Sequence, residues 1–449
     1  MRILVIGAGE VGRYIAERLV REGHDLVVLD KEPGAIARIN ELDVYGVVGD
    51  GTDPATLRDN GIDHTDLVLA VSQIDSVNLT ACAYAARLGA TRSVARLSES
   101  ARTPEDARLA REAFGVDWVI NPDEEAAREI VGLLEGRQVT DSMEFDDGHV
   151  RVIGVRVDES SKLANRSLLE LGQDHRETLA LVVAIVRQDA TIIPRGDHRI
   201  LPGDRVYMIG ARDQLGQFVN AADTVERPRG PRKILVVGGG QVGERVAARL
   251  EAAEFSVSLL EADRERSEQL AVTLARTTVL HGDGRSLVAL KESGVEDVDG
   301  FVSVSGDEET NVMSALLARH LGAPKVIALV KRTEYIPVLR EIGLDAAVNP
   351  RLTAAGAILR FVRRGHILQV STFRDIDAEV LELVASERSR AVGRPLRDVD
   401  FPRDAILGGF SRDGGFGIPR GDTVLQAHDR VIVFALPSAI PKVEKLFAG

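Results

Sequence analysis

Cysteine is nearly absent from this sequence, and so is any excess of positive charge. The 449 residues contain one cysteine, Cys82, so no disulfide can form within the chain, and a reducing, cytoplasmic compartment is expected. Lysine and arginine together number 56 against 69 aspartates and glutamates, which leaves a formal net charge of −13. This balance argues against general nucleic-acid binding, because that role needs a positive surface.

Long hydrophobic runs are also missing. The longest uninterrupted apolar stretch, residues 179–186, has eight residues, whereas a membrane-spanning helix needs about 20. The opening residues, MRILVIGAGE, run directly into a glycine turn and lack the cleavage site of a signal peptide. We therefore expect neither a transmembrane helix nor a secretion signal.

The sequence contains a tandem repeat. Residues 2–12 read RILVIGAGEVG and residues 233–243 read KILVVGGGQVG. Further matches, in the same order, pair residues 49–51 with 282–284, 88–90 with 321–323, 121–122 with 349–350, and 193–197 with 418–422. Because five matches keep their order along the chain, we infer a duplication of the whole unit.

Each half begins with short Val/Ile/Leu runs that alternate with helical patterns. In the first half the predicted strands are residues 3–6, 26–29, 44–48, 67–71, 93–96 and 118–120. Apolar strands alternating with helices indicate an α/β fold with a doubly wound parallel sheet, as in Rossmann domains. The second part of each half looks like a small α+β lobe with antiparallel strands, predicted at residues 152–157, 179–187, 380–384, 405–410 and 430–435.

These patterns predict five segments. They are a Rossmann-like lobe at residues 1–123, a small lobe at 137–224, a linker at 225–231, a second Rossmann-like lobe at 232–352 and a second small lobe at 366–449. The linker region, VERPRGPRK, has two prolines and four basic residues. It reads as a solvated connection, with a basic contact to phospholipid or to a partner as the alternative.

Helical stretches at residues 123–136 and 353–364 connect the two parts of each half. In the first of them, an apolar stripe is formed by Ile130, Val131, Leu133 and Leu134. The stripe either packs on its own domain or swaps across a dimer, and the sequence leaves both interpretations open.

A glycine loop follows the first predicted strand of each half. Gly7, Gly9 and Gly12 form a GxGxxG motif that opens a helix, and Asp30 ends the second strand. In this context Gly7 permits the tight turn, Gly9 lets a pyrophosphate approach the backbone, and Gly12 lets the helix pack on the strand. Asp30 would accept hydrogen bonds from ribose hydroxyls, which favours NAD over NADP. The second copy consists of Gly238, Gly240 and Gly243, with Glu261 at the acid position.

Other candidate residues lie where parallel strands end, because ligands of open α/β sheets bind at that edge. In the first half these are Asp50, Ser72, Gln73 and Arg96, and in the second half Asp283, Ser305 and Lys331. We expect Arg96 and Lys331 to offer cations to phosphate at equivalent places.

The residue patterns of common catalytic centres are missing. None of the five tyrosines has a lysine four residues later, and no spacing of His, Cys and acidic residues suggests a transition-metal site. A chain of this kind can bind a redox nucleotide as a signal rather than as a reagent. A non-catalytic NAD-binding regulator is therefore favoured over the alternative, an NAD-dependent oxidoreductase on a duplicated scaffold.

Two Rossmann-like lobes, each followed by a small lobe, resemble the RCK (KTN) regulators of potassium conductance, and the tandem arrangement resembles the peripheral regulatory subunits of Trk potassium-uptake systems. The segments that carry the resemblance are ILVIGAGEVG, VVLD, NLTACAYAARLGA, ILVVGGGQVG, NVMSALLARHLGA and LQAHDRVIVF. The resemblance implies a non-enzymatic subunit at the cytoplasmic face of the membrane. It also implies that several chains, expected as a homotetramer, assemble as a dimer of dimers or a ring beneath a separate potassium-translocating membrane subunit. The pore of that subunit would open or close as nucleotide changes the shape of the assembly.

By position, the resemblance and the motifs assign two nucleotide sites and no catalytic or metal-binding residue. The first comprises Gly7, Ala8, Gly9, Glu10, Val11, Gly12, Asp30, Asp50, Ser72, Gln73 and Arg96, and the second comprises Gly238, Gly239, Gly240, Gln241, Val242, Gly243, Glu261, Asp283, Ser305 and Lys331.

Charge at the fourth loop position distinguishes the two sites. The carboxylate of Glu10 would repel a γ-phosphate, so NAD+ or NADH is expected at the first site. Gln241 brings no such repulsion, which leaves ATP or ADP open at the second. Relatives use an acid after the strand-end proline near a dimer axis. Asp123 fits that pattern, whereas the second half has Arg351, and a cation at Asp123 is a hypothesis.

Overall fold

A computed structural model of the chain describes most of its residues. The described ranges are 1–21, 23–101, 103–134, 139–145, 149–174, 180–188, 190–211, 214–215, 232–362, 367–372 and 378–448. The predicted linker at 225–231 lies outside them. Within these ranges no helix is both long and apolar enough to cross a membrane.

The first half opens with a six-stranded parallel sheet in the order β3-β2-β1-β4-β5-β6, which is the order of a doubly wound Rossmann fold. Its strands are β1 (Arg2–Ile6), β2 (Asp25–Asp30), β3 (Tyr45–Val48), β4 (Leu67–Ala70), β5 (Arg92–Arg96) and β6 (Trp118–Ile120). The helices are α1 (Glu10–Arg21), α2 (Pro33–Ile39), α3 (Pro54–Asp59), α4 (Asp75–Leu88) and α5 (Pro104–Phe114), with a short 3-10 turn, η1 (Ile62–His64). The six strands confirm the strands predicted from the apolar runs. The central strands β1, β2 and β4 are buried on both faces and apolar almost throughout.

The second half repeats this lobe with the sheet order β14-β13-β12-β15-β16-β17. The strands are β12 (Lys233–Val237), β13 (Ser256–Glu261), β14 (Thr278–His281), β15 (Gly300–Ser303), β16 (Val326–Leu329) and β17 (Ala346–Val348). The helices are α9 (Gln241–Ala252), α10 (Arg264–Thr273), α11 (Leu287–Glu292), α12 (Glu308–His320) and α13 (Tyr335–Glu341), with η3 (Val295–Asp297). The duplication inferred from sequence is therefore a duplication of topology.

Each small lobe is a five-stranded sheet of antiparallel pairs, ordered β10-β9-β11-β8-β7 and β18-β19-β22-β20-β21. The first contains β7 (Val139–Phe145), β8 (Val150–Arg156), α7 (Leu168–Asp174), β9 (Ala180–Arg187), β10 (Ala190–Ile192) and β11 (Arg205–Ala211). The second contains β18 (Ile367–Thr372), β19 (Glu379–Val384), η4 (Leu396–Asp398), β20 (Ala405–Arg412), β21 (Gly415–Gly417), β22 (Arg430–Ala435), η5 (Pro437–Ala439) and α15 (Ile440–Ala448). The fold class predicted from sequence is thus confirmed in both halves.

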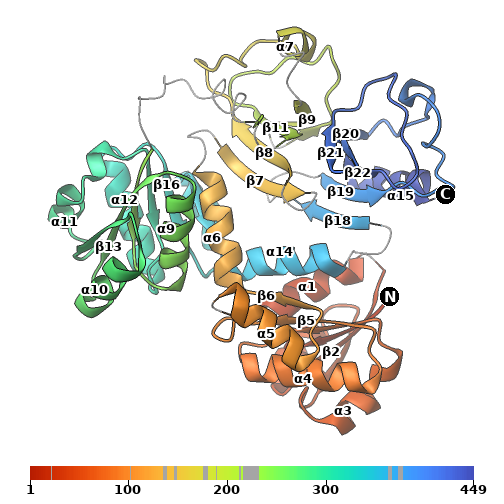
Figure 1. The fold of residues 1–449 in the computed structure, drawn as a ribbon, viewed down its shortest axis with the longest axis horizontal. Helices are drawn as coiled ribbons and strands as arrows, with labels where there is room; N and C mark the ends of the chain where they lie inside the picture. The colour runs from red at the N-terminus through yellow and green to blue at the C-terminus, as the bar shows by residue number, and fades with distance from the viewer. Residues whose placement is uncertain are drawn as a thin grey trace.

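The two small lobes pack against each other within one chain, at the upper right of Figure 1. Their shared core contains Val183 and Ile209 from the first lobe together with Val380 and Phe434 from the second. A Cβ added to Gly408 of β20 would lie 3.1 Å from both Ile209 and Val183. The sheets therefore approach closely at this glycine.

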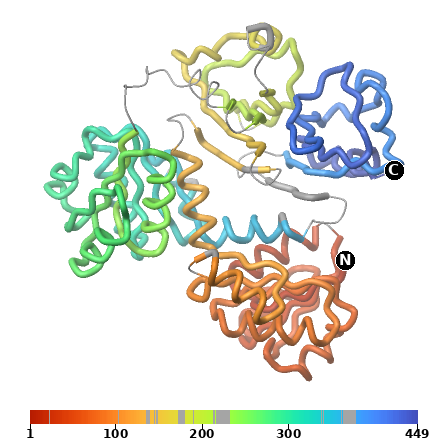
Figure 2. Tube along the Cα trace, in the orientation of Figure 1, coloured from red at the N-terminus to blue at the C-terminus, as the bar shows by residue number. Residues whose placement is uncertain are grey.

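The connecting helices α6 (Pro122–Leu133) and α14 (Pro350–Val362) pack on the opposite halves of the chain. Figures 1 and 2 show α6 beside α9 of the second Rossmann lobe and α14 beside α1 of the first. The apolar stripe of α6, including Ile130 and Leu133, joins the core of the second sheet, whereas Ile358 and Val362 of α14 join the core of the first. A fully buried Ile or Leu side chain contributes about 1.5–3 kcal/mol, so the exchange stabilises both lobes.

The sequence left open packing on the stripe's own domain and a swap across a dimer. The structure shows instead a swap between the two halves of one chain. The helices cross where Thr353 Oγ1 donates a hydrogen bond of 2.7 Å to Glu129 Oε2. At the far end of α14, Phe361 stacks on Trp118 of β6 with ring centroids 4.9 Å apart. Each Rossmann lobe is completed by a helix from the other half.

Candidate nucleotide-binding sites

The first glycine loop has the geometry that a dinucleotide loop requires. Gly7 has a φ of +105°, a value that favours glycine, and its N–H donates to the carbonyl of Leu29 at 2.8 Å. A Cβ on Gly12 would lie 1.8 Å from the Gly7 carbonyl oxygen, whereas a Cβ on Gly9 would meet no atom within 4 Å. Gly12 is thus required by packing, and Gly9 borders open space at the start of α1.

The acid at the end of β2 braces this loop. Asp30 Oδ2 accepts a hydrogen bond of 2.6 Å from the Ala8 N–H, and Oδ1 accepts one of 2.9 Å from the Glu32 N–H. Because each carboxylate oxygen can accept two hydrogen bonds, both oxygens retain capacity for ribose hydroxyls. Asp30 therefore combines a structural contact with an available acceptor.

The second glycine loop repeats the same contacts. Gly238 has a φ of +98°, and a Cβ on Gly243 would lie 1.9 Å from the Gly238 carbonyl oxygen. Glu261 accepts hydrogen bonds from the N–H groups of Gly239 at 2.5 Å and Asp263 at 2.8 Å. The two loops are built alike, and α9 starts at the second as α1 starts at the first.

The other predicted loop residues differ in burial. The side chains of Val11 and Val242, in the first turns of α1 and α9, are buried in the cores of their lobes. Gly240, like Gly9, borders open space.

Two buried asparagines, which the sequence reasoning missed, hold the neighbouring strand ends. Asn78 Nδ2 donates to the carbonyls of Ser72 at 2.9 Å and Arg96 at 2.7 Å, while its Oδ1 accepts from the Ser72 N–H. Asn311 does the same with Ser305 and Leu329. The signal was available, because the repeated segments NLTACAYAARLGA and NVMSALLARHLGA both begin with this asparagine.

These bonds correct the pairing of Arg96 with Lys331. The residue equivalent to Arg96 is Leu329, because both carbonyls accept from the repeated asparagine. Lys331 instead corresponds to Ser98, since the N–H groups of both are held by the first acid of the following helix, Asp75 or Glu308. The Lys331 ammonium donates to the Gly306 carbonyl at 2.6 Å. Among the described residues, the position equivalent to Arg96 at the second site is therefore occupied by Leu329, which brings no guanidinium.

Among the remaining predicted residues, Asp50 and Asp283 have local partners. Asp50 accepts from the N–H and hydroxyl of Thr52, and the Lys31 ammonium lies 2.9 Å from it. These contacts, the Thr52 bonds foremost, lower the pKa of Asp50 to about 2. Asp283 pairs with Arg285 in the second half. Gln73 is exposed next to Ser72.

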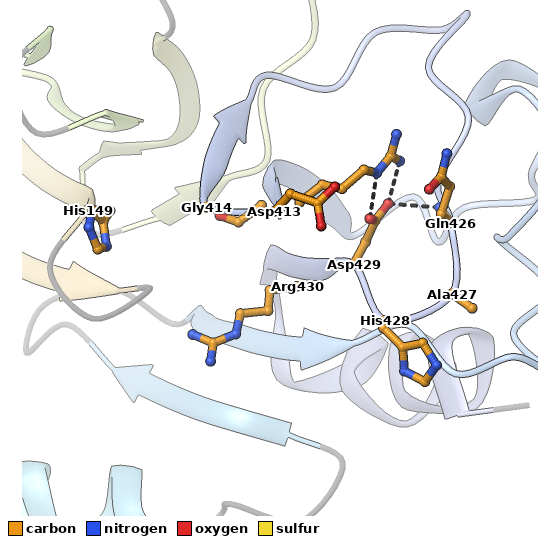
Figure 3. Close-up of a pocket in the computed structure, with 10 residues that line it drawn as sticks. His149, Asp413, Gly414, Gln426, Ala427, His428, Asp429 and Arg430 are labelled. Carbon is orange, nitrogen blue, oxygen red and sulfur yellow. Dashed lines mark hydrogen bonds and ion pairs between the residues drawn. The ribbon is translucent and has the colours of Figure 1, made fainter.

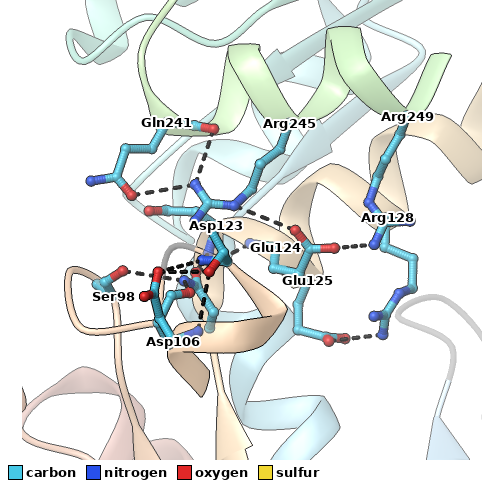
Figure 4. A network of polar contacts seen from close by, with 12 residues as sticks. Ser98, Asp106, Asp123, Glu124, Glu125, Arg128, Gln241, Arg245 and Arg249 are labelled. Atoms are coloured by element: carbon cyan, nitrogen blue, oxygen red, sulfur yellow. Dashed lines mark hydrogen bonds and ion pairs between the residues drawn. The ribbon is translucent and has the colours of Figure 1, made fainter. Parts of the chain in front are cut away.

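Each site is bordered by the first turn of the other half's connecting helix. At the first site, Arg351 of α14 forms an ion pair with Glu10. At the second, Glu124 of α6 pairs with Arg249 and, at 3.3 Å, with Arg245 (Figure 4). Gln241 of the second loop also donates to Glu99, which follows β5, at 2.6 Å. The sequence argument treated Glu10 as an unpaired negative charge, and that premise is wrong.

Asp123 lies in the same network. Burial raises its pKa, while the positive charges of Arg245 and Arg96 act in the opposite direction. The positive charges of the two neighbouring guanidiniums would repel a cation. In addition, the described residues contain no group of three His, Cys, Asp or Glu side chains suited to a metal. The hypothesis of a cation at Asp123 gains no support from this geometry.

A separate hollow of about 420 Å³ lies among His149, Asp413, His428 and Arg430 near the two small lobes (Figure 3). Arg412, on its wall, makes a two-pronged ion pair with Asp429, at 2.8 and 2.7 Å. The first small lobe repeats this pair as Arg187 and Asp204, at 2.8 Å for both bonds. Because the pair recurs in the first lobe and Asp429 is buried, it braces the lobe and gives no reason to assign a ligand.

Comparison with known proteins identifies the family. The TrkA-N domain family matches residues 3–122 and 234–350, and the TrkA-C domain family matches residues 152–222 and 380–448. A Trk system potassium uptake protein TrkA from Azorhizobium caulinodans is 36% identical over 453 residues, covering 100% of this chain and 98% of its own length. The chain belongs to the TrkA family.

Solved structures support the same fold for this TrkA-family chain. The GsuK RCK domain matches with a TM-score of 0.61 at 17% identity, covering 100% of this chain and 95% of that one. The GsuK channel bound to NAD matches with a TM-score of 0.62, also at 17% identity, covering 100% of this chain and 79% of that one. The predicted resemblance to tandem RCK proteins is thus confirmed at the level of family and fold.

Proposed function

We propose that this chain is a regulatory subunit that binds NAD+ or NADH and gates a membrane potassium-transport protein. The chain acts at the cytoplasmic face of the membrane, as part of an oligomeric ring. Two observations about relatives support this proposal: the family is named for potassium uptake, and a channel of the same fold has been solved with NAD bound.

The observation that carries the proposal is the exchange of α6 and α14. The first nucleotide loop contacts Arg351 of α14, and the second contacts Glu99, which follows β5 of the first half. Because both contacts come from the other half, a ligand at either loop acts on the packing between halves. A ligand shifts a conformational equilibrium only by its different affinities for the two states, and coupling of about 1–3 kcal/mol per site is typical. In a ring of several chains, such contributions would add.

The charges bordering the two loops suggest how their ligands differ. Glu10 is paired with Arg351, so the first site tolerates phosphates better than its sequence implied. Glu99 approaches the second loop instead and accepts a hydrogen bond from the uncharged amide of Gln241, whereas Glu124 is paired with Arg245 and Arg249. We propose NAD+ or NADH at the first site and weaker binding of any polyphosphate at the second. This proposal makes ATP or ADP less favoured at the second site than the sequence, which left them open there, had indicated.

Calorimetric titration of the full chain tests this function. NADH, NAD+, ATP and ADP are titrated into the wild type, Asp30→Ala, Glu261→Ala and Asp59→Ala. Asp59 is an exposed acid at the end of α3 and serves as the matched control. Loss of the Asp30 acceptor should weaken NADH binding at the first site about tenfold or more, while Asp59→Ala should bind as the wild type does.

Potassium flux into vesicles that contain the membrane subunit then tests gating. Flux should depend on added nucleotide with the wild type and lose that dependence with Asp30→Ala. A wild-type chain that binds no nucleotide would contradict the sensor mechanism, and binding without any effect on flux would contradict gating.

A further inference from the structure

We propose that Arg351, carried by the second half, completes the phosphate subsite of the first glycine loop together with Arg96, and that Glu10 holds Arg351 in place until a nucleotide phosphate takes it over. This inference rests on the proposed nucleotide binding. It adds to the site a phosphate-binding residue, Arg351, that lies outside the glycine motif. The ligand class is a pyrophosphate-bearing nucleotide.

The backbone of Arg351 is fixed in position. The buried side chain of Asn349 accepts hydrogen bonds from the N–H groups of Arg351 at 2.9 Å and Leu352 at 3.1 Å, and its amide donates to the Lys331 carbonyl at 2.8 Å. Behind this turn, α14 packs on α1 through the core of the first lobe. The arginine is thereby delivered to Glu10, the first residue of α1.

The ion pair itself is easily exchanged. The side chains of Glu10 and Arg351 are 67% and 34% exposed, and pairs this open to solvent contribute little to stability. The first N–H groups of a helix lack partners within the helix and bind anions. A phosphate at the start of α1 would therefore compete with the Glu10 carboxylate for Arg351 at little cost.

Arg96 supplies the independent observation. Among the described residues, its buried Nε has no hydrogen-bond partner, although its carbonyl is held by Asn78. Burial is the main reason that its pKa is lowered, and the nearby charge of Arg351 lowers it further, against smaller opposite effects of Asp123 and Asp75. Arg351 is held at the glycine loop by Glu10, and its charge acts on the neighbouring guanidinium of Arg96, whose Nε has an unused donor. An anion bound between the two guanidiniums would stabilise both.

The second half lacks this arrangement. The sequence pairs Arg351 with Asp123 and Glu10 with Gln241, and the repeated asparagine bonds pair Arg96 with Leu329. The proposed pair of phosphate-binding arginines, Arg351 and Arg96, which we call the clamp, therefore belongs to the first site alone.

Titration of full-length variants tests the clamp. Each variant carries Glu261→Ala, so that the first site dominates, and NADH is compared with adenosine, which has no phosphate. Arg351→Gln should weaken NADH binding about tenfold, the value of one charge-assisted hydrogen bond, and leave adenosine binding unchanged. Glu10→Gln should tighten NADH binding, because it frees Arg351, and this gain should vanish in the double variant.

The outcomes separate the clamp from the proposed function. An equal loss of NADH and adenosine binding in Arg351→Gln would mean a structural role and overturn the clamp. Unchanged NADH binding in that variant would also overturn it, while the regulatory function stands. Failure of the wild-type chain to bind NADH would overturn both. Thermal unfolding of each variant is measured as the control for correct folding of the lobes.

Discussion

At the scale of single residues, two glycines of the first loop have different roles: Gly12 is required for packing, and Gly9 leaves space for a ligand. A Cβ at Gly12 would collide with the Gly7 carbonyl, whereas a Cβ at Gly9 meets nothing. We expect Gly12→Ala to lower the unfolding free energy by about 1–3 kcal/mol, the usual cost of overpacking. Gly9→Ala should unfold as the wild type does but lose NADH affinity, because its methyl group occupies the space a pyrophosphate needs.

Thermal unfolding and NADH titration of both variants check this separation, and each variant serves as the control for the other. A Gly9→Ala chain that binds NADH normally would mean that the phosphates do not approach the loop at this glycine.

At the scale of elements, the exchange of α6 and α14 predicts which Rossmann lobe loses stability when a core residue of either helix is replaced. Ile130 of α6 is fully buried in the core of the second Rossmann lobe, and Ile358 of α14 is fully buried in the core of the first. Replacing either by alanine should cost about 2–5 kcal/mol. Hydrogen exchange should rise in β12–β17 for Ile130→Ala and in β1–β6 for Ile358→Ala.

The two variants are mirror controls in one experiment. Faster exchange in a helix's own half would contradict the swapped packing.

The exchange also marks the limit of what the sequence could predict. The apolar runs predicted all six strands of the first sheet. Among them β1, β2 and β4 are buried on both faces and are therefore apolar almost throughout. The stripe around Ile130 indicated a buried helix face but carried no information on which surface buries it. The ion pair of Glu10 with Arg351 joins positions 341 residues apart, and nothing in either local sequence predicts it. The hydrogen bonds of Asn78 to Ser72 and Arg96 were detectable only by comparing the two halves.

At the scale of the whole molecule, the two halves form an internal pseudo-dimer whose contacts are not interchangeable. The core of the first lobe uses side chains of α14 and that of the second uses α6. Lys325, 2% exposed, adds a contact between the second Rossmann lobe and the first small lobe, donating to the Val139 carbonyl at 2.6 Å. A half expressed alone would therefore leave a large apolar surface open.

This asymmetry predicts how separated halves assemble. In a homodimer of residues 1–224, α6 of the second copy would take the place of α14, so Glu10 would face Asp123 rather than Arg351. The repulsion between these two carboxylates disfavours the homodimer of the first half, whereas the Glu10–Arg351 attraction favours the complex of the two different halves. This difference in contact energy gives the assembly its specificity. We expect residues 1–224 and 232–449, produced together, to form a one-to-one complex in preference to either homodimer.

Sedimentation of the mixed and separate halves measures this preference. Replacing Asp123 by arginine in the first half should strengthen its homodimer, because each copy would then restore the cation that Glu10 meets in the intact chain. Stable monomers of both halves would contradict the argument, since each Rossmann core would then be complete without the helix it now receives from the other half.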